Sequence, residues 1–111
     1  MTLIYKLLSQ KEWMGALGRG YFEGSAVDHV DGYIHFSTAA QLPETAAKHF
    51  HGREDLVALE VDADVLGEAL RWEPSRGGDL FPHLYADLPV TAVKRALMVE
   101  LGPEGAPRVE L

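Results

Sequence analysis

Residues 32–38 read "GYIHFST", and this stretch decides how the chain is expected to fold around its polar centre. Its side chains alternate as in a strand, with Tyr33 and His35 on one face. The strand stops at Ser37 and Thr38, which are residue types that favour the start of a helix. His35 is therefore expected at the carboxyl end of a strand beside two hydroxyls, a position at which open α/β folds bind ligands.

A second histidine has a similar setting further along the chain. Residues 72–89 read "WEPSRGGDLFPHLYADLP", which places His83 among aromatic residues and two positions before Tyr85. If this segment is extended, the side chains of His83 and Tyr85 point to the same side. Two interpretations remain open: His35 and His83 are core histidines with hydrogen-bond partners, or they face each other across a site.

The composition is that of one ordinary globular domain. The chain has 111 residues, of which 47% are hydrophobic and 24% are charged, which is enough for one core and too little for two. It has neither the roughly 18 to 20 consecutive apolar residues of a membrane span nor a basic and apolar leader. Cysteine is absent, which excludes disulfides and thiolate chemistry. We therefore expect a cytoplasmic protein that does not interact with membranes.

The net charge of −7 argues against nucleic acid as a partner. Only ten Lys and Arg residues stand among seventeen acidic residues, and they are scattered. Binding to a phosphate backbone depends on clustered basic residues, and binding to an anionic membrane is disfavoured for the same reason. A small molecule is the remaining class of partner.

Apolar periodicity and turn residues predict an α+β fold: a single small domain over residues 1–111 with a mixed, mostly antiparallel sheet and two or three short helices. The core is expected from about residue 3 to 101, with residues 102–111 as a loosely held tail. Residues 90–101 fit a helix or a strand, and their alternation from Val93 onwards favours a strand. The expected strands are 3–8, 33–36, 56–61, 70–72 and 93–101. One helix is expected to begin after the capping box at Ser9, and a second helix is expected over residues 42–50.

The segment Ser75-Arg76-Gly77-Gly78 begins a long loop that is a candidate for anion binding. Paired glycines allow positive φ and let backbone N–H groups approach an anion. Arg76 adds a fork of donors suited to phosphate or carboxylate. The alternative is an ordinary turn with a solvated arginine, because glycine pairs most often mark loops.

Glu73 is the most notable of the acidic residues, because it lies between Trp72 and Pro74. An aromatic neighbour that removes water from a carboxyl raises its pKa, which suits a catalytic acid or base. The alternative is a carboxylate at the end of a strand and in water, where acidic residues usually lie. Glu73 therefore joins His35 and His83 as a candidate catalytic residue.

A metal site is not expected. His49 and His51 lack the i, i+4 spacing with which a helix presents two ligands. They are better placed to interact with the C-terminal end of a helix. No pair of metal ligands stands close together in the sequence.

Several motifs together resemble the bacterial and plant domain-of-unknown-function family 952 (DUF952). The resemblance runs from about Leu3 to Leu101. Its two most specific marks are "DGYIHFST" and "WEPSRGGDLFPHLY". The segments that carry it are "IYKL", Trp13, "GSAVDHVDGYIHFSTAAQL", "TAAKHF", "DLVALEVD" and "LRWEPSRGGDLFPHLYADLP".

The resemblance implies a fold similar to the ADP-ribosylation fold of NAD-using ADP-ribosyltransferases. It implies that His35 holds the ribose next to nicotinamide as a neutral imidazole, with Ser37 and Thr38 beside it. Tyr85 becomes a candidate aromatic partner of nicotinamide, and Arg76 a candidate partner of the pyrophosphate. The resemblance implies that Glu73 activates the acceptor, but the sequence around Glu73 lacks the E-x-E pattern of the transferases.

Two hypotheses follow from the resemblance and the residues. The first is an ADP-ribosyltransferase-like enzyme that uses NAD, and the second is a non-catalytic module that binds a nucleotide-like or other small anionic ligand. Both require a cleft lined by His35, Ser37, Arg76, His83 and Tyr85. Both require His35 and His83 to lie within about 12 Å of each other, since one small ligand must touch both.

Overall fold

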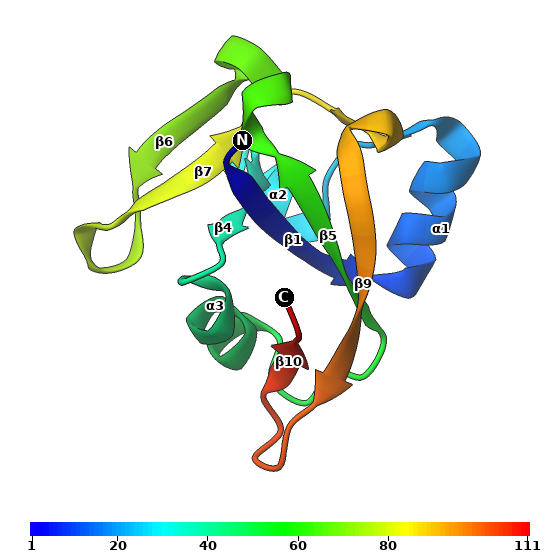
Figure 1. Ribbon diagram of the computed structural model, residues 1–111, viewed down its shortest axis with the longest axis vertical. Coiled ribbons are helices and arrows are strands. Elements are labelled where there is room, and N and C mark those ends of the chain that lie inside the picture. Colours follow the sequence, from blue (N-terminus) through cyan, green and yellow to red (C-terminus); the bar gives the residue numbers. More distant parts are fainter.

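The computed structural model describes residues 1–111, except for the side chain of Arg76. A five-stranded sheet has the order β10-β9-β5-β1-β4 (Figure 1). A three-stranded sheet has the order β3-β7-β6, and β2 pairs with β8. Every strand pairing among the described residues is antiparallel. The strands are β1 (Leu3–Ser9), β2 (Tyr21–Phe22), β3 (Ile34–His35), β4 (Ser37–Thr38), β5 (Leu56–Asp62), β6 (Leu70–Pro74), β7 (Leu80–Leu84), β8 (Leu88–Pro89), β9 (Val93–Leu101) and β10 (Pro107–Val109).

Three α-helices and three 3₁₀ segments connect these strands. The helices are α1 (Gln10–Arg19), α2 (Ala26–Asp31) and α3 (Leu42–His49), and the 3₁₀ segments are η1 (Ala63–Ala69), η2 (Arg76–Gly78) and η3 (Val90–Ala92). None of the helices in the described chain has the length and apolar character that crossing a bilayer requires.

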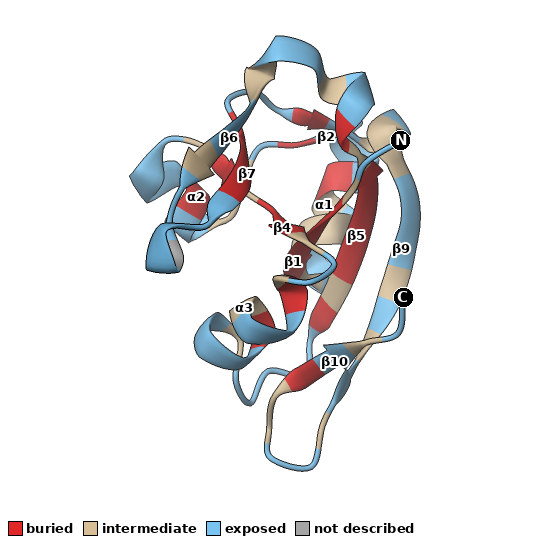
Figure 2. Ribbon diagram, turned by 60° about the vertical axis from the view of Figure 1, so that its left-hand side comes forward, coloured by how far each residue is buried: buried red, intermediate tan, exposed pale blue. Residues whose placement is uncertain are grey.

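The core lies on both faces of the five-stranded sheet, because alternate side chains of β1 and β5 point to opposite faces. On one face Ile4, Leu8 and Leu59 belong to the larger apolar cluster. On the other face Tyr5 and Leu7 pack with residues of α3. Figure 2 shows that β1 and β5 are mostly buried, whereas β9 is largely exposed or half-buried.

The chain changes sheets within the stretch "GYIHFST". Ile34 and His35 pair with β7 of the three-stranded sheet, and Ser37 and Thr38 pair with β1 of the five-stranded sheet. Between them, the Phe36 N–H donates to the Pro82 carbonyl at 3.0 Å, and the Phe36 side chain is buried in the larger cluster. The two sheets therefore separate on either side of one continuous segment.

The sequence-based fold prediction is confirmed at the level of class, since the chain forms a small α+β domain with an antiparallel sheet. The capping box at Ser9 is present: Ser9 Oγ accepts from the Glu12 N–H at 3.0 Å, and Glu12 Oε1 accepts from the Ser9 N–H at 2.9 Å. Ser37 and Thr38, expected to cap a helix, instead form β4. Thr38 then exchanges two hydrogen bonds with Gln41, just before α3 begins.

Two segments outside the strands and helices expected from the sequence contain regular structure. The first is α2, a helix of six residues that ends at Gly32, whose left-handed backbone (φ 88°) closes it. The second is β7, which pairs with β6 along five residues of each strand. Neither pattern is strong in the sequence, because α2 is too short to show a helical period and a proline interrupts β7.

Residues 102–111, for which we expected a loosely held tail, include β10. This strand pairs with β9, and its Pro107 is buried. The Gly102 N–H donates to the Ala106 carbonyl at 2.8 Å, which closes the turn between the two strands. The turn also meets the end of α3, because the Gly52 N–H donates to the Gly105 carbonyl at 2.7 Å.

Replacing Leu59 by Ala is predicted to lower the free energy of unfolding by about 2 to 5 kcal/mol, because it leaves a cavity in the core. Leu59 is 0% exposed, whereas Met98 on neighbouring β9 is 83% exposed. The matched control, Met98→Ala, should change the free energy of unfolding by no more than about 0.5 kcal/mol. Urea denaturation measures both, and equal effects would contradict this assignment of the core.

Candidate functional site

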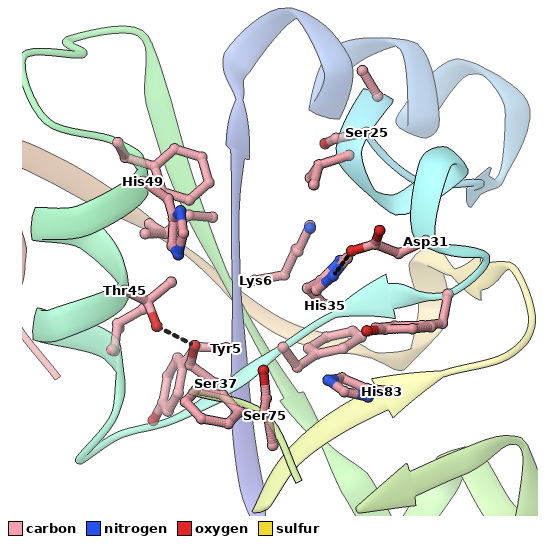
Figure 3. A pocket seen from close by; sticks show the side chains of 18 of the residues that line it. Tyr5, Lys6, Ser25, Asp31, His35, Ser37, Thr45, His49, Ser75 and His83 are labelled. Atoms are coloured by element: carbon pink, nitrogen blue, oxygen red, sulfur yellow. Dashed lines mark hydrogen bonds and ion pairs between the residues drawn. The ribbon is translucent and has the colours of Figure 1, made fainter. Parts of the chain in front are cut away.

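A cavity of about 650 Å³ lies where the two sheets separate, and we call it the split cavity. Strand β1 forms one side, with helices α2 and α3 and strands β3 and β7 around it (Figure 3). The residues that line it are Tyr5, Lys6, Leu7, Glu12, Ser25, Ala26, Val27, Asp31, Tyr33, His35, Phe36, Ser37, Leu42, Thr45, His49, Phe50, Arg53, Ser75, Phe81 and His83.

Leu7 lines the split cavity, and its main-chain groups point away from β5. The Gln10 N–H donates to the Asp55 carbonyl, and the Ala63 N–H donates to the Thr2 carbonyl. Hydrogen-bonded pairs alternate along an antiparallel ladder. These two bonds and the β1–β5 register therefore show that the N–H and carbonyl groups of even-numbered β1 residues point toward β5, and those of odd-numbered residues point away from it.

On the side away from β5, strand β4 pairs with β1 only at Ile4 and Tyr5. The Ser9 N–H is taken by Glu12. No strand residue in the described chain stands opposite Leu7 on this side, and Leu7 is only 3% exposed. Its N–H and carbonyl are therefore a buried donor and acceptor at the wall of the cavity, and such groups normally have a partner.

A buried ion pair anchors α2 beside the cavity. Lys6 Nζ lies 3.0 Å from Asp28 Oδ1 and 2.9 Å from Asp28 Oδ2, and both side chains are almost completely buried. Asp28 also accepts from the N–H groups of Ser25 and His35 at 2.8 and 3.1 Å. One carboxylate thus connects β1, the start of α2 and the start of β3.

Burial and neighbouring charges shift the pKa values of this pair. Burial alone would raise the pKa of Asp28, but the hydrogen bond from His35 and the charge of Lys6 lower it from 3.8 to about 2. Burial lowers the pKa of Lys6 below its usual 10.5, and Asp28 opposes that shift. Asp28 is therefore held as a carboxylate.

Both ring nitrogens of His35 contact carboxylates. Nδ1 lies 2.6 Å from Asp28 Oδ1, and Nε2 lies 2.8 Å from Asp31 Oδ2. Figure 3 shows the contact between His35 and Asp31, with Lys6 next to them. Carboxylates only accept hydrogen bonds, so a ring nitrogen that bonds to one of them is the donor.

The second histidine stands directly opposite the first across the β3–β7 pairing. The ring centroids of His35 and His83 are 5.7 Å apart, and Tyr33 stacks on His83 with a centroid distance of 4.0 Å. His83 Nδ1 lies 2.8 Å from Glu73 Oε1, which also accepts from the Tyr85 hydroxyl at 2.7 Å. Each histidine thus has a hydrogen-bond partner, and both line the split cavity.

The environment of Glu73 differs from that expected from its aromatic neighbour. The hydrogen bonds from Tyr85 and His83 lower the pKa of the Glu73 carboxyl, and burial opposes them only weakly. Trp72 lies on the other face of β6, because neighbouring side chains of a strand alternate. Glu73 is therefore a carboxylate that orients His83.

The candidate residues from the sequence fall into two groups. His35, Ser37, Ser75 and His83 line the split cavity. Among the described residues, Thr38, Glu73, Gly77, Gly78 and Tyr85 do not line it. Tyr85 instead packs on Tyr33, with ring centroids 5.3 Å apart.

The segment expected to bind an anion forms a tight turn. The Gly78 N–H donates to the Ser75 carbonyl at 2.8 Å, and the Ser75 N–H donates to the Asp79 carbonyl at 2.9 Å. Gly77 and Gly78 have positive φ values of 69° and 84°, as the sequence suggests. The proposed role of Arg76 lies outside the described part of the structure.

Lys6, Asp28 and Asp31 were not identified from the sequence. Lys6 had a visible signal, because it is a charge within the apolar run "LIYKLL". Asp28 and Asp31 had none beyond their acidity. Within the chain that the structure describes, no three His, Asp or Glu side chains are arranged to hold a metal ion.

The fold and the site define a class: an α+β domain with separate antiparallel sheets around a cavity that two facing histidines line. The chain belongs to the family described as "Protein of unknown function (DUF952)", whose model matches residues 7–96. The family expected from the sequence motifs is thus confirmed. No curated protein matches the sequence.

Solved structures of one relative resemble this chain closely. The crystal structure of protein CC0527 from Caulobacter crescentus is 54% identical, with a TM-score of 0.94 over 96% of this chain and 94% of that chain. The solution NMR structure of CC0527 is 55% identical, with a TM-score of 0.88 over 97% of this chain and 93% of that chain.

Replacing Asp28 by Asn is predicted to lower the free energy of unfolding at pH 7 by about 3 kcal/mol, because Lys6 is left as a buried charge without its counter-ion. The folded pKa of Asp28 is about 2, below its usual 3.8. The contribution of the Asp28 carboxylate to the free energy of unfolding is therefore complete above about pH 4 and is lost as the pH falls through about 2. This contribution amounts to about 2 kcal/mol.

Urea denaturation between pH 2 and pH 7 tests this linkage. The Asp28→Asn variant should lack the part of the acid destabilisation that the wild type shows between about pH 4 and pH 2. Asp87→Asn, a change at an exposed residue, should retain the wild-type profile. Identical profiles for all three proteins would contradict the role given to Asp28.

Proposed function

We propose that this protein binds an NAD-like dinucleotide in the split cavity and transfers its ADP-ribosyl group to an acceptor. The observation that carries the proposal is the Leu7 main chain, which presents a buried donor and acceptor side by side, near His35 and His83. A planar group with an adjacent acceptor and donor fits that pair. NAD carries two such groups, the carboxamide of nicotinamide and the edge of adenine.

The size and lining of the cavity support a ligand of this kind. Its volume of about 650 Å³ is within the range of small-molecule sites. Its lining combines apolar side chains such as Leu42 and Phe81 with Lys6, Arg53 and the histidines. The separation of two antiparallel sheets around it supports our proposal that the fold is similar to the ADP-ribosylation fold.

The proposed chemistry uses His83 as the base. The bond between the ribose C1′ and the nicotinamide nitrogen breaks, and nicotinamide leaves with the electron pair. An oxygen or nitrogen of the acceptor bonds to C1′ and gives its proton to His83. Donation from His83 Nδ1 to Glu73 at 2.8 Å leaves Nε2 with a free electron pair for that proton. Glu73 is thus a positioning residue, which differs from the direct role that the resemblance implies.

A second candidate is a module that binds the same ligand without turnover. It is favoured by the position of Glu73, which lies outside the lining of the split cavity and accepts from His83 and Tyr85. It is also favoured by His35, whose two ring nitrogens already contact carboxylates. We also propose a cytoplasmic location, since a chain without cysteine has no need of an oxidising compartment.

Isothermal titration of the protein with NAD, ADP-ribose and nucleoside phosphates is predicted to detect binding by at least NAD and ADP-ribose. Phe81→Ala should weaken it, because Phe81 is one of the apolar residues of the cavity wall. Met98→Ala, far from the lining, serves as the control. If titration with each of these ligands produced no heat, and none of them displaced another, the nucleotide proposal would be wrong.

Replacing Glu73 by Gln is predicted to separate the two candidates. For an enzyme, release of nicotinamide from NAD in the presence of an acceptor should fall roughly 100-fold, a loss typical of impaired acid–base catalysis. The dissociation constant for NAD should change little, because Gln occupies the same space. The control is Glu100→Gln on exposed β9. Binding of NAD with no nicotinamide release by the wild type would instead support the non-catalytic module.

A further inference from the structure

The two ring nitrogens of His35 are held in very different ways. Nδ1 contacts Asp28, whose side chain is 1% exposed and is also held by Lys6 and two backbone N–H groups. Nε2 contacts Asp31, whose side chain is 42% exposed. The Asp28 contact is therefore a fixed part of the fold, whereas the Asp31 carboxylate already lies partly in water.

Asp31 also lies where a carboxylate is disfavoured. It is the last residue of α2 and is followed by Gly32, which ends the helix. Negative charge at the C-terminal end of a helix is unfavourable because the backbone carbonyls point there. His35 is the partner that offsets this cost, at 2.8 Å.

The contact stands at the wall of the split cavity, since Asp31 and His35 both line it. The charged neighbours of His35 are Lys6, Asp28 and Asp31, and Lys6 and Asp28 neutralise each other. What remains is a donor on His35 Nε2 that faces an anionic oxygen. A ligand oxygen that replaces Asp31 preserves this arrangement best if it too is anionic.

We infer that the Asp31 carboxylate stands in the place of an anionic oxygen of the ligand, and that a phosphate oxygen exchanges with it at His35 Nε2. This inference rests on the proposed nucleotide binding and names the ligand group at His35: a pyrophosphate oxygen, where the family resemblance implies a ribose hydroxyl. Asp31 is then an internal competitor that a phosphate-bearing ligand must displace and that a neutral nucleoside does not displace.

The test compares wild-type protein with Asp31→Asn, using ADP-ribose and adenosine as probes in isothermal titration. Removal of the competing negative charge should tighten ADP-ribose binding about tenfold and leave adenosine binding within about twofold. Asp31→Ala should show the same gain, while Asp31→Glu, which keeps the charge, should not. Asp87→Asn makes the same charge change at an exposed residue outside the cavity lining and controls for the net charge.

A second measurement reports on the exchange itself. In nitrogen-15 spectra, ADP-ribose should shift the His35 Nε2 signal of the wild type and leave its Nδ1 signal nearly unchanged, because the Asp28 contact persists. Circular dichroism confirms that each variant is folded.

The possible results separate this inference from the proposed function. If ADP-ribose binds the wild type and Asp31→Asn weakens that binding or leaves it unchanged, Asp31 is not a competitor and the inference is overturned, while nucleotide binding stands. An equal gain for adenosine and ADP-ribose would overturn the assignment of a phosphate oxygen to His35 Nε2. If no variant binds either probe, the nucleotide proposal fails and the inference fails with it.

Discussion

The structure depends on a change of hydrogen-bonding partner at Phe36. Before this residue the chain pairs with β7, and after it the chain pairs with β1. A continuous strand cannot follow both sheets, so the sheets separate, and the wedge between them becomes a cavity with main-chain polar groups at its wall. The same pairing sets His35 opposite His83, so one segment both opens the site and supplies one of its histidines.

The ion pair of Lys6 and Asp28 gives the split cavity a defined shape. A buried pair of this kind adds little net stability, because the loss of hydration offsets the attraction between the charges. It does penalise alternative arrangements, since any displacement of α2 would leave one of the two charges buried alone. Its contribution is therefore geometric: it fixes a six-residue helix that has little stability of its own.

The sequence predicts the features that arise from local patterns. The strands around Leu59 and Val93, the capping box at Ser9 and the helix from Leu42 follow from periodicity and from capping residues, as does the α+β class. The hairpin of β6 and β7 does not, because its pairing is established between segments rather than within one, and Pro82 makes β7 look like a loop.

The site is predictable in part for the same reason. The motif around His35 and the position of His83 identify them as unusual residues, but their face-to-face arrangement depends on the register of two strands. Lys6 is visible as a charge in an apolar run, yet its partner is 22 residues away in a helix without a clear period. The contact between Asp31 and His35 becomes apparent only from the structure, which places the end of α2 against the imidazole ring of His35.

Different kinds of interaction hold the α3 wall and the α2 wall of the split cavity, so the two walls should respond differently to temperature. The α3 wall rests on apolar packing of Leu42 and Ala46 and on the turn near Gly105, whereas the α2 wall rests on charge. Cooling weakens apolar packing and leaves the ionic contacts largely intact. We therefore expect cooling to loosen the α3 wall before the α2 wall, so that the temperature decides which side of the cavity opens first.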